Sequence, residues 1–157
     1  MSDIHSYDLT ITWTGDRGRG TATYNAFGRD HLVEADGHEP ILGSSDPAFR
    51  GDASRWNPEE MLLASLSQCH MLWYLHLAAD AEVVVTGYVD RPHGVMSTAA
   101  DGSGQFDRVT LRPRVTITAG SDVEAALLVH HRVPDFCFIA RSVNFPVDHE
   151  PEIVVAE

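Results

Sequence analysis

Two cysteines, Cys69 and Cys137, offer the most versatile chemistry in this chain. A thiolate is a nucleophile and a metal ligand, and two thiols that meet can close a disulfide. Cys69 stands within Ser-Leu-Ser-Gln-Cys-His at residues 65–70, and on a helix its face would also carry Leu62, Leu66 and Leu72. Cys137 follows Pro134, where the free amides of a short helix would favour its thiolate. Buried free cysteines are also often inert, and the sequence by itself does not bring the two sulfurs together.

Two other kinds of thiol chemistry compete with redox chemistry. A zinc site would use histidines, but no Cys-x-x-Cys or His-Glu-x-x-His pattern is present, and His70 and His76 would lie roughly 240° apart around one helix. We therefore predict no metal and no cofactor. His130 and His131 suit a helix C-terminus, and the other histidines are expected in loops or on the surface. A cysteine hydrolase could use His131 as its base, but no known nucleophile signature surrounds Cys69.

The element that must position Cys69 is a long helix, predicted over residues 57–80. Asn57 can cap it, Pro58 suits its first position, and Glu60 completes an Asn-x-x-Glu capping box. Apolar residues cover most of its circumference: Met61, Leu62, Leu63, Ala64, Leu66, Met71, Leu72, Trp73, Leu75 and Leu77. Such a helix must be buried on all sides, which a monomer of 157 residues can hardly do. The pattern therefore predicts a dimer.

The N-terminal part, residues 1–56, is expected to be β-rich. Residues 7–13 (YDLTITW) alternate apolar and polar side chains, which is typical of a half-buried strand. A glycine-rich turn follows, so residues 21–27 (TATYNAF) are predicted as the return strand of a hairpin, with another strand near residues 31–35. Residues 36–56, rich in Gly, Pro and Ser, predict a long surface loop, and such loops are often functional.

The C-terminal part, residues 81–157, is expected to hold the other strands and a second helix. A capping box from Ser121 to Glu124 starts that helix, which should run to about His131 before a further helical turn. The predicted strands cover residues 83–89, 95–99, 106–118 and 145–156. The order βββ-α-βββ-α-β lacks a regular βαβ alternation, so we predict a single α+β domain over residues 1–157.

Composition excludes several partners. The chain has 11 Lys+Arg against 23 Asp+Glu, a net charge of -12, which argues against nucleic acid and anionic membranes. The most apolar stretch, residues 61–79, carries serines and histidines that a membrane span would rarely hold. The first eight residues are polar and acidic, unlike a signal peptide. We therefore expect a cytoplasmic protein with reduced thiols.

Residues 57–70, Asn-Pro-Glu-Glu-Met-Leu-Leu-Ala-Ser-Leu-Ser-Gln-Cys-His, resemble the central-helix motif of the OsmC/Ohr family, in which Asn-Pro-Glu precedes the first cysteine by this spacing. Residues 131–142, around Cys137, resemble the second-cysteine segment of the family. The resemblance implies an OsmC-like α+β fold, with antiparallel sheets packed around long central helices in an intertwined homodimer. Two positions depart from the pattern: His70 stands where an aromatic residue is common, and Phe138 where many members have proline.

The resemblance also implies an activity: a thiol-dependent peroxidase that reduces organic hydroperoxides in oxidative or osmotic stress defence. Cys69 would be the peroxidatic thiolate, which becomes a sulfenic acid, and Cys137 the resolving cysteine, which closes a disulfide with it. An external dithiol, such as a lipoylated protein, would reduce that disulfide. The alternative is a non-catalytic OsmC-like stress protein that binds an apolar ligand at the dimer interface.

Family members activate the first cysteine with an arginine that a glutamate, here Glu59, holds in place. One branch carries the arginine in an early Gly-Arg-Asp turn, which matches Arg29, and another just ahead of the Asn-Pro-Glu helix, which matches Arg50. We favour Arg50, because Phe-Arg-Gly-Asp at residues 49–52 occupies that place. Glu59 and Cys69 would be ~15 Å apart along one helix, so Glu59 is expected to serve the thiol of the other subunit.

Overall fold

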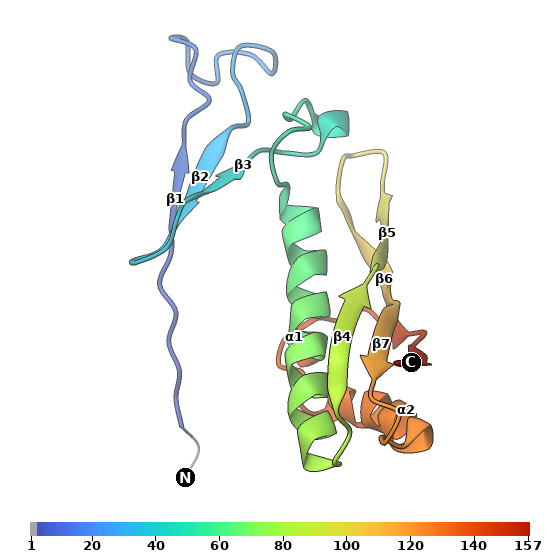
Figure 1. Ribbon diagram of the computed structural model, residues 1–157. Helices are drawn as coiled ribbons and strands as arrows, with labels where there is room; N and C mark the ends of the chain where they lie inside the picture. The colour runs from blue at the N-terminus through green and yellow to red at the C-terminus, as the bar shows by residue number, and fades with distance from the viewer. Residues whose placement is uncertain (1–2) are drawn as a thin grey trace. The chain divides into compact units, whose positions relative to one another are not determined.

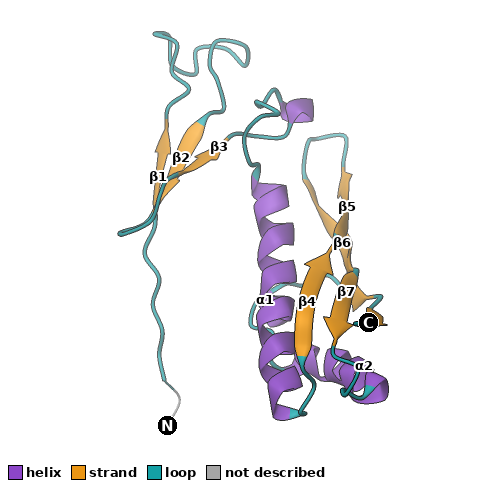
Figure 2. Ribbon diagram, viewed as in Figure 1, coloured by secondary structure: helices purple, strands orange, loops and turns teal. Residues whose placement is uncertain are grey.

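The computed structural model describes residues 3–157 (Figures 1 and 2). Met1 and Ser2, which begin the polar N-terminal stretch, lie outside the described residues. The chain forms two compact units, one ending at Met61 and one over Leu62–Glu157. Within the described residues the order is βββ-α-ββββ-α-ββ, with short 3-10 helices between some of the elements. The α+β class predicted from the sequence is confirmed.

The first unit contains a three-stranded antiparallel sheet in the order β1-β2-β3. Its strands are β1 (Thr10–Trp13), β2 (His31–Glu34) and β3 (Ile41–Gly43). The 3-10 helix η1 (Pro47–Phe49) follows, and the Asp46 side chain caps it by accepting from the Ala48 amide. Because β3 and η1 fall within residues 36–56, that segment is more ordered than the long loop predicted from its composition.

The predicted return strand over residues 21–27 is wrong, because those residues form turns and bends and β2 pairs with β1 instead. A contact between two glycines explains the difference. The Gly28 amide donates to the Gly15 carbonyl at 2.7 Å, and the Trp13 indole donates to the Gly28 carbonyl at 2.9 Å. A Cβ on Gly15 would lie 2.1 Å from the Gly28 oxygen, so this approach requires glycine. The chain between them loops out, and pairing resumes at His31.

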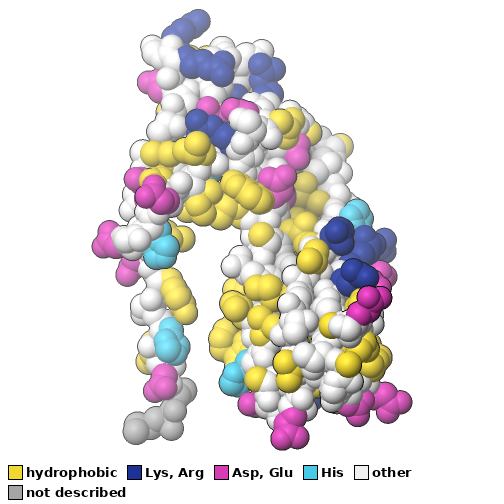
Figure 3. Space-filling view, in the orientation of Figure 1, with side chains coloured by type: hydrophobic (Ala, Val, Ile, Leu, Met, Phe, Trp, Pro, Cys, Tyr) yellow, Lys and Arg dark blue, Asp and Glu magenta, His cyan; other side chains and the backbone are white. Residues whose placement is uncertain are grey.

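The first unit has no buried apolar side chain among its described residues. Leu9, Ile11 and Trp13, which the sequence pattern placed on the buried face of a strand, are 65%, 61% and 45% exposed. Figure 3 shows apolar side chains, in yellow, gathered over this sheet. A small sheet is stable only when an apolar face is covered, so this unit lacks a hydrophobic core of its own.

The long helix is confirmed as α1 (Pro58–Asp80), and the boundary between the two units falls inside it. Its capping box is present: the Asn57 side chain accepts from the Glu60 amide at 2.7 Å, and the Glu60 carboxylate accepts from the Asn57 amide at 3.2 Å. The buried side chains of α1 form one stripe, Leu66, His70, Tyr74, Leu77 and Ala78. Leu72 and Leu75 remain exposed within one chain. No helix among the described residues has the length and apolarity to cross a membrane.

The second unit holds two three-stranded sheets, β4-β7-β9 and β5-β6-β8. The first consists of β4 (Val85–Asp90), β7 (Pro113–Ile117) and β9 (Glu152–Val155). The second consists of β5 (His93–Thr98), β6 (Gly104–Leu111) and β8 (Val147–His149). The β4–β7 and β5–β6 pairings are antiparallel, as the resemblance implied, and the β6–β8 and β7–β9 pairings add parallel neighbours.

Two strands predicted as continuous are each divided. Residues 106–118 form β6 and β7 on either side of Arg112, whose amide donates to the Asp90 side chain at 2.6 Å rather than to a ladder partner. Residues 145–156 form β8 and β9, separated at Pro151, which cannot donate to a ladder. As a result, the two halves of each segment belong to different sheets of this unit.

The second helix is α2 (Val123–Arg132), and its N-cap lies one residue later than predicted. Asp122, not Ser121, is the N-cap: its carboxylate accepts from the Glu124 amide at 2.8 Å. The Ser121 hydroxyl instead accepts from the Val84 amide at 2.9 Å, which ties the start of α2 to β4. After α2 come the 3-10 helices η2 (Val133–Asp135) and η3 (Ala140–Ser142), where the sequence predicted a helical turn.

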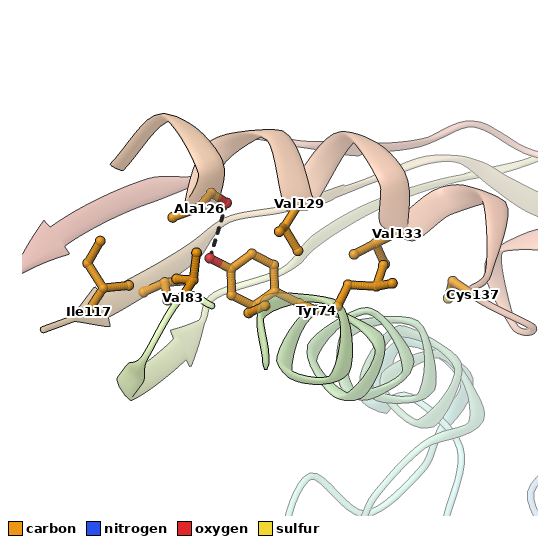
Figure 4. Close-up of a cluster of buried hydrophobic side chains, with 10 residues drawn as sticks. Tyr74, Val83, Ile117, Ala126, Val129, Val133 and Cys137 are labelled. Carbon is orange, nitrogen blue, oxygen red and sulfur yellow. Dashed lines mark hydrogen bonds between the residues drawn. The ribbon is translucent and has the colours of Figure 1, made fainter. Parts of the chain in front are cut away.

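The main core of the second unit lies between α1, α2 and the β4-β7-β9 sheet. Its buried residues are Tyr74, Leu77, Ala78, Val83, Val115, Ile117, Ala126, Val129, Val133 and Cys137. Figure 4 shows Tyr74 in the middle of this cluster, its hydroxyl donating to the Ala126 carbonyl at 3.1 Å. This hydrogen bond joins α1 directly to α2, the two helices that lead to the cysteines.

Candidate functional site

The two cysteines meet in the second unit. Cys69 lies in α1, is partly buried and packs against the core cluster that contains Cys137. Cys137 lies between η2 and η3, is only 1% exposed, and is held by its amide, which donates to the Val133 carbonyl at 2.9 Å. Both are free thiols, and Cys69 is close enough to act on the titration of Cys137. Two sulfurs remote in the sequence are therefore neighbours in the fold.

The two thiols have different surroundings. Burial raises the pKa of Cys137 to about 11, and the neighbouring Cys69 side chain acts in the same direction. The amides of Ala140 and Ile139 oppose this rise without cancelling it. The expectation that local amides would favour the Cys137 thiolate is therefore wrong, because desolvation outweighs them. Near neutral pH, Cys137 is a protonated thiol.

An aromatic surface lies beside the cysteines. Trp73, one helical turn after Cys69, contacts the rings of Phe136 and Phe138, with centroids 5.2 and 5.5 Å away. These two phenylalanines flank Cys137 in the sequence. Leu72, Trp73 and His76 line an open hollow of about 240 Å³ on the same stretch of α1. An apolar molecule that approached the thiols would meet this surface first.

The two candidate arginines converge on one aromatic ring in the first unit. The Arg29 guanidinium lies 4.4 Å from the Tyr24 ring centre and donates to the Phe27 carbonyl at 2.6 Å and the Tyr24 carbonyl at 2.9 Å. The Arg50 guanidinium lies 5.9 Å from the same ring, on a residue with a left-handed backbone, φ 68°. It donates no side-chain hydrogen bond to any residue that the structure describes.

Glu59 lies in the first turn of α1, within the first unit, and forms no ion pair among residues 3–157. Its neighbour Glu60 is the residue engaged in the capping box. Glu59 and both arginines thus belong to the first unit, whereas Cys69 and Cys137 belong to the second.

A buried histidine pair is the feature that the sequence argument missed. His70 and His130 are 4% and 0% exposed, and the His70 Nε2 lies 3.0 Å from the His130 Nδ1. The ring of His149 lies near both. The expected position of His130 and His131 at a helix C-terminus is confirmed, whereas the expectation of a surface or loop position is wrong for His70, which is buried. Burial lowers the pKa of His70 to about 4 and that of His130 to about 3. The spacing of His70 with Leu66 and Tyr74, four residues on either side, was the signal for a buried position.

The histidines do not form a metal centre. Within the described part of the chain, no three His, Cys, Asp or Glu side chains are arranged so that they could hold an ion. The rings of His70 and His130 are nearly parallel, at 13°, with centroids 5.3 Å apart. The pair is therefore two nearly coplanar imidazoles joined edge to edge by a hydrogen bond between α1 and α2.

The fold and motif agree with a known protein family. Residues 51–152 match the family model described as OsmC-like protein, which covers both cysteines and Glu59. The chain therefore belongs to the OsmC family. No curated protein sequence matches the chain.

Solved structures agree with that membership. An OsmC-like protein of unknown function from Vibrio cholerae is 30% identical, with a TM-score of 0.84 over 94% of this chain and 99% of that one. The organic hydroperoxide resistance protein OsmC of Legionella pneumophila is 13% identical, with a TM-score of 0.70 over 97% and 98%. The organic hydroperoxide resistance protein OhrB of Bacillus subtilis is 17% identical, with a TM-score of 0.63 over 96% and 98%. At such identities, the last two comparisons show a shared fold.

Proposed function

We propose that this protein is a thiol peroxidase that reduces organic hydroperoxides in stress defence. The observation that carries the proposal is the cysteine pair: Cys69, partly exposed, packs against the buried Cys137. A solvent-accessible thiol with a second thiol in contact can be oxidised and then form a disulfide without a large rearrangement. The Legionella and Bacillus proteins that share the fold are named for organic hydroperoxide resistance, which supports the same substrate class.

The chemistry balances with the residues present and one external reductant. The Cys69 thiolate attacks the distal peroxide oxygen: an S–O bond forms, the O–O bond breaks, and the leaving alkoxide takes a proton to become an alcohol. The Cys137 thiol then attacks the sulfenic sulfur, a disulfide forms and water leaves. An external dithiol, of the kind that a lipoylated protein carries, supplies two electrons and two protons to restore both thiols.

The surroundings of the two cysteines support the proposed division of roles. Cys137 is 1% exposed and protonated near neutral pH, so it is a poor first nucleophile. Cys69 is the more accessible sulfur and lies beside the aromatic surface of Trp73, which can hold the organic part of a hydroperoxide. Cys69 is therefore the peroxidatic residue of the proposal and Cys137 the resolving one.

A cation near Cys69 completes the proposed site. A guanidinium beside a thiol favours the thiolate, and it can donate to the departing oxygen. We assign this role to Arg50, because Arg29 already donates to two backbone carbonyls. Glu59 would hold the guanidinium from the partner subunit, since ten residues of helix separate it from the Cys69 of its own chain.

A homodimer is part of the proposal. The part of the first unit that the structure describes has no buried apolar side chain, and α1 exposes Leu72 and Leu75. Surfaces of this kind are costly in a monomer, and a second copy would cover them. Sedimentation of the reduced protein should give the mass of two chains, and a monomer that kept full activity would contradict the shared site.

The experiment that tests the activity is a thiol titration in denaturant, on samples of the reduced protein taken before and after one equivalent of cumene hydroperoxide. The proposal expects the loss of both thiols, a mass decrease of about two hydrogens, and one equivalent of cumyl alcohol. If both thiols remain and the hydroperoxide is not consumed, the protein is instead a non-catalytic OsmC-like protein that binds an apolar ligand.

A further inference from the structure

We propose that the buried His70–His130 pair is a positioning element that keeps Cys69 and Cys137 within bonding reach. The inference rests on the proposed function, because it concerns the step in which Cys69 and Cys137 form a disulfide. The two histidines are not among the cysteines, arginines and glutamate of the proposed site. At one of the two positions, that of His70, family members commonly have an aromatic residue instead.

Each histidine is rigidly connected to one sulfur. His70 follows Cys69 directly in α1. His130 lies in α2, which continues into η2, and the amides of Phe136 and Cys137 both donate to the Val133 carbonyl at 2.9 Å. A bond between the two imidazoles therefore fixes the two cysteine-bearing segments against each other.

The pair is supported on one side by Tyr74. Its ring stacks on His130 with centroids 4.0 Å apart, and its hydroxyl donates to the Ala126 carbonyl one turn earlier in α2. The contact between α1 and α2 thus has two polar ties, each buried. A polar bond inside an apolar contact is directional, so it sets the register between helices more strictly than side-chain packing does.

Hydrogen bonding indicates which nitrogen carries the proton. The His130 Nε2 is buried and has no partner among the described residues, and an orphaned N–H would be costly there. The arrangement that avoids this cost has His130 donating from Nδ1 to the His70 Nε2, which leaves a bare lone pair at the His130 Nε2. Protonation of His130 would place an unpaired N–H at that buried atom.

The surroundings of the pair keep it neutral. The groups that face it are Tyr74 on α1, His131 on α2 and His149 on β8; Tyr88 on β4 lies behind Tyr74, and Asp148 acts on His149. None of the groups in direct contact is a carboxylate that could pair with an imidazolium. The pair therefore stays intact through the neutral range and is disrupted only in acid.

The test measures disulfide closure with the diazene diamide, an oxidant that does not require peroxidase activity. The Cys69 thiol adds to the N=N bond, and the Cys137 thiol displaces the adduct, so that one disulfide forms and the diazene is reduced to the hydrazine. His130→Phe keeps the ring and removes the bond, and we expect closure about tenfold slower with the Cys69 adduct accumulating. His130→Asn returns a donor near the Nδ1 position and should close within about twofold of the unmodified chain.

Three measurements separate positioning from general damage. The first step, adduct formation at Cys69, should keep its rate in both variants, and His93→Asn, at an exposed histidine of the same unit, should leave both steps unchanged. Closure from the preformed adduct slows roughly tenfold per pH unit as the Cys137 thiolate is lost, and in the unmodified chain an additional slowing should appear in acid as the pair takes up a proton. If His130→Phe does not fold, His70→Leu against His70→Gln supplies the same comparison, since glutamine replaces the Nε2 acceptor.

Closure at the unmodified rate in His130→Phe, or in His70→Leu where that pair is used, would overturn the inference. So would equal slowing in the bond-retaining and bond-deleting variants. Failure of the proposed function looks different: hydroperoxide would leave both thiols free while diamide still closed the disulfide in the histidine-dependent way.

Discussion

Cys137 lies buried against Cys69, and its pKa is raised to about 11, so the pair combines one accessible sulfur with one that is protonated and shielded. This difference in exposure and pKa suits Cys69 to the attack on the hydroperoxide and Cys137 to the later formation of the disulfide. Substitution of each cysteine by serine is therefore informative, because the two variants should fail at different steps of the reaction.

Cys137→Ser should allow a single turnover. Cys69 would still reduce one equivalent of hydroperoxide, but its sulfenic acid would have no thiol to attack it and would persist or pass to sulfinic acid. Intact mass after one and after ten equivalents of hydroperoxide measures this, with expected gains of one and then two oxygens. The matched variant Cys69→Ser should consume no hydroperoxide at all. Steady turnover by Cys137→Ser with dithiol would remove the resolving role.

Arg50→Ala should lower kcat/KM for cumene hydroperoxide by about 10²-fold, the usual loss when one donor to a developing negative charge is removed. Arg29→Ala should have a smaller effect on rate, because the Arg29 guanidinium is committed to the carbonyls of Phe27 and Tyr24. Arg108→Ala, an exposed arginine on β6, serves as the control for net charge. The reverse order of the first two variants would move the role to Arg29.

The stability of the second unit should fall as the pH drops from about 6.5 towards 4. The folded pKa values of His70 and His130, about 4 and about 3, lie below the ordinary value of 6.5. Below pH 6.5 the unfolded chain therefore binds protons that the folded chain excludes, and the free energy of unfolding decreases. The loss should be on the order of a few kcal/mol, at about 1.4 kcal/mol per pKa unit.

Urea unfolding followed by near-ultraviolet circular dichroism at pH 7, 6, 5 and 4.5 measures this dependence. His93→Asn should preserve it, because His93 is exposed, whereas His130→Asn should reduce it. A free energy of unfolding that stayed constant over this interval would mean that the pair is charged or solvated in the folded protein.

Trp73→Ala should reduce the preference for bulky hydroperoxides. The Trp73 ring, with Phe136 and Phe138, forms the apolar surface beside the thiols. Removing it should lower the kcat/KM ratio of cumene hydroperoxide to hydrogen peroxide about tenfold, since burial of an apolar group contributes about 1.5–3 kcal/mol. Leu128→Ala, at an exposed apolar position of α2, is the control. An unchanged ratio would place the organic group elsewhere.

Local signals predicted the parts of the fold that depend on local interactions. The capping box of Asn57 and Glu60 located the start of α1, because both hydrogen bonds form within one turn. The return strand of the first hairpin was misplaced because the contact between Gly15 and Gly28, which decides it, joins residues that are not neighbours in the sequence. Ser121 was wrongly predicted as the cap of α2. Its hydroxyl instead accepts from the Val84 amide, just ahead of β4, and this contact between remote residues is not visible in the sequence.

The candidate site divides in the same way. Cys69 and Cys137 were found because thiols are rare and chemically distinctive, but their contact follows from the packing of α1 against α2. The raised pKa of Cys137 also could not be predicted, since the amide effect is local and desolvation is not. The burial of His70 could have been predicted from its four-residue spacing to Leu66 and Tyr74. Its hydrogen bond to His130 could not, because that bond depends on which face of α2 packs against α1.

The burial of Cys137 also determines its fate among the small electrophiles and free thiols of a cell. A sulfur that is 1% exposed is closed to glutathione and to alkylating reagents as long as the second unit stays folded. In a cysteine-labelling experiment on the folded protein, thiol reagents would therefore modify Cys69, and Cys137 would react only with Cys69.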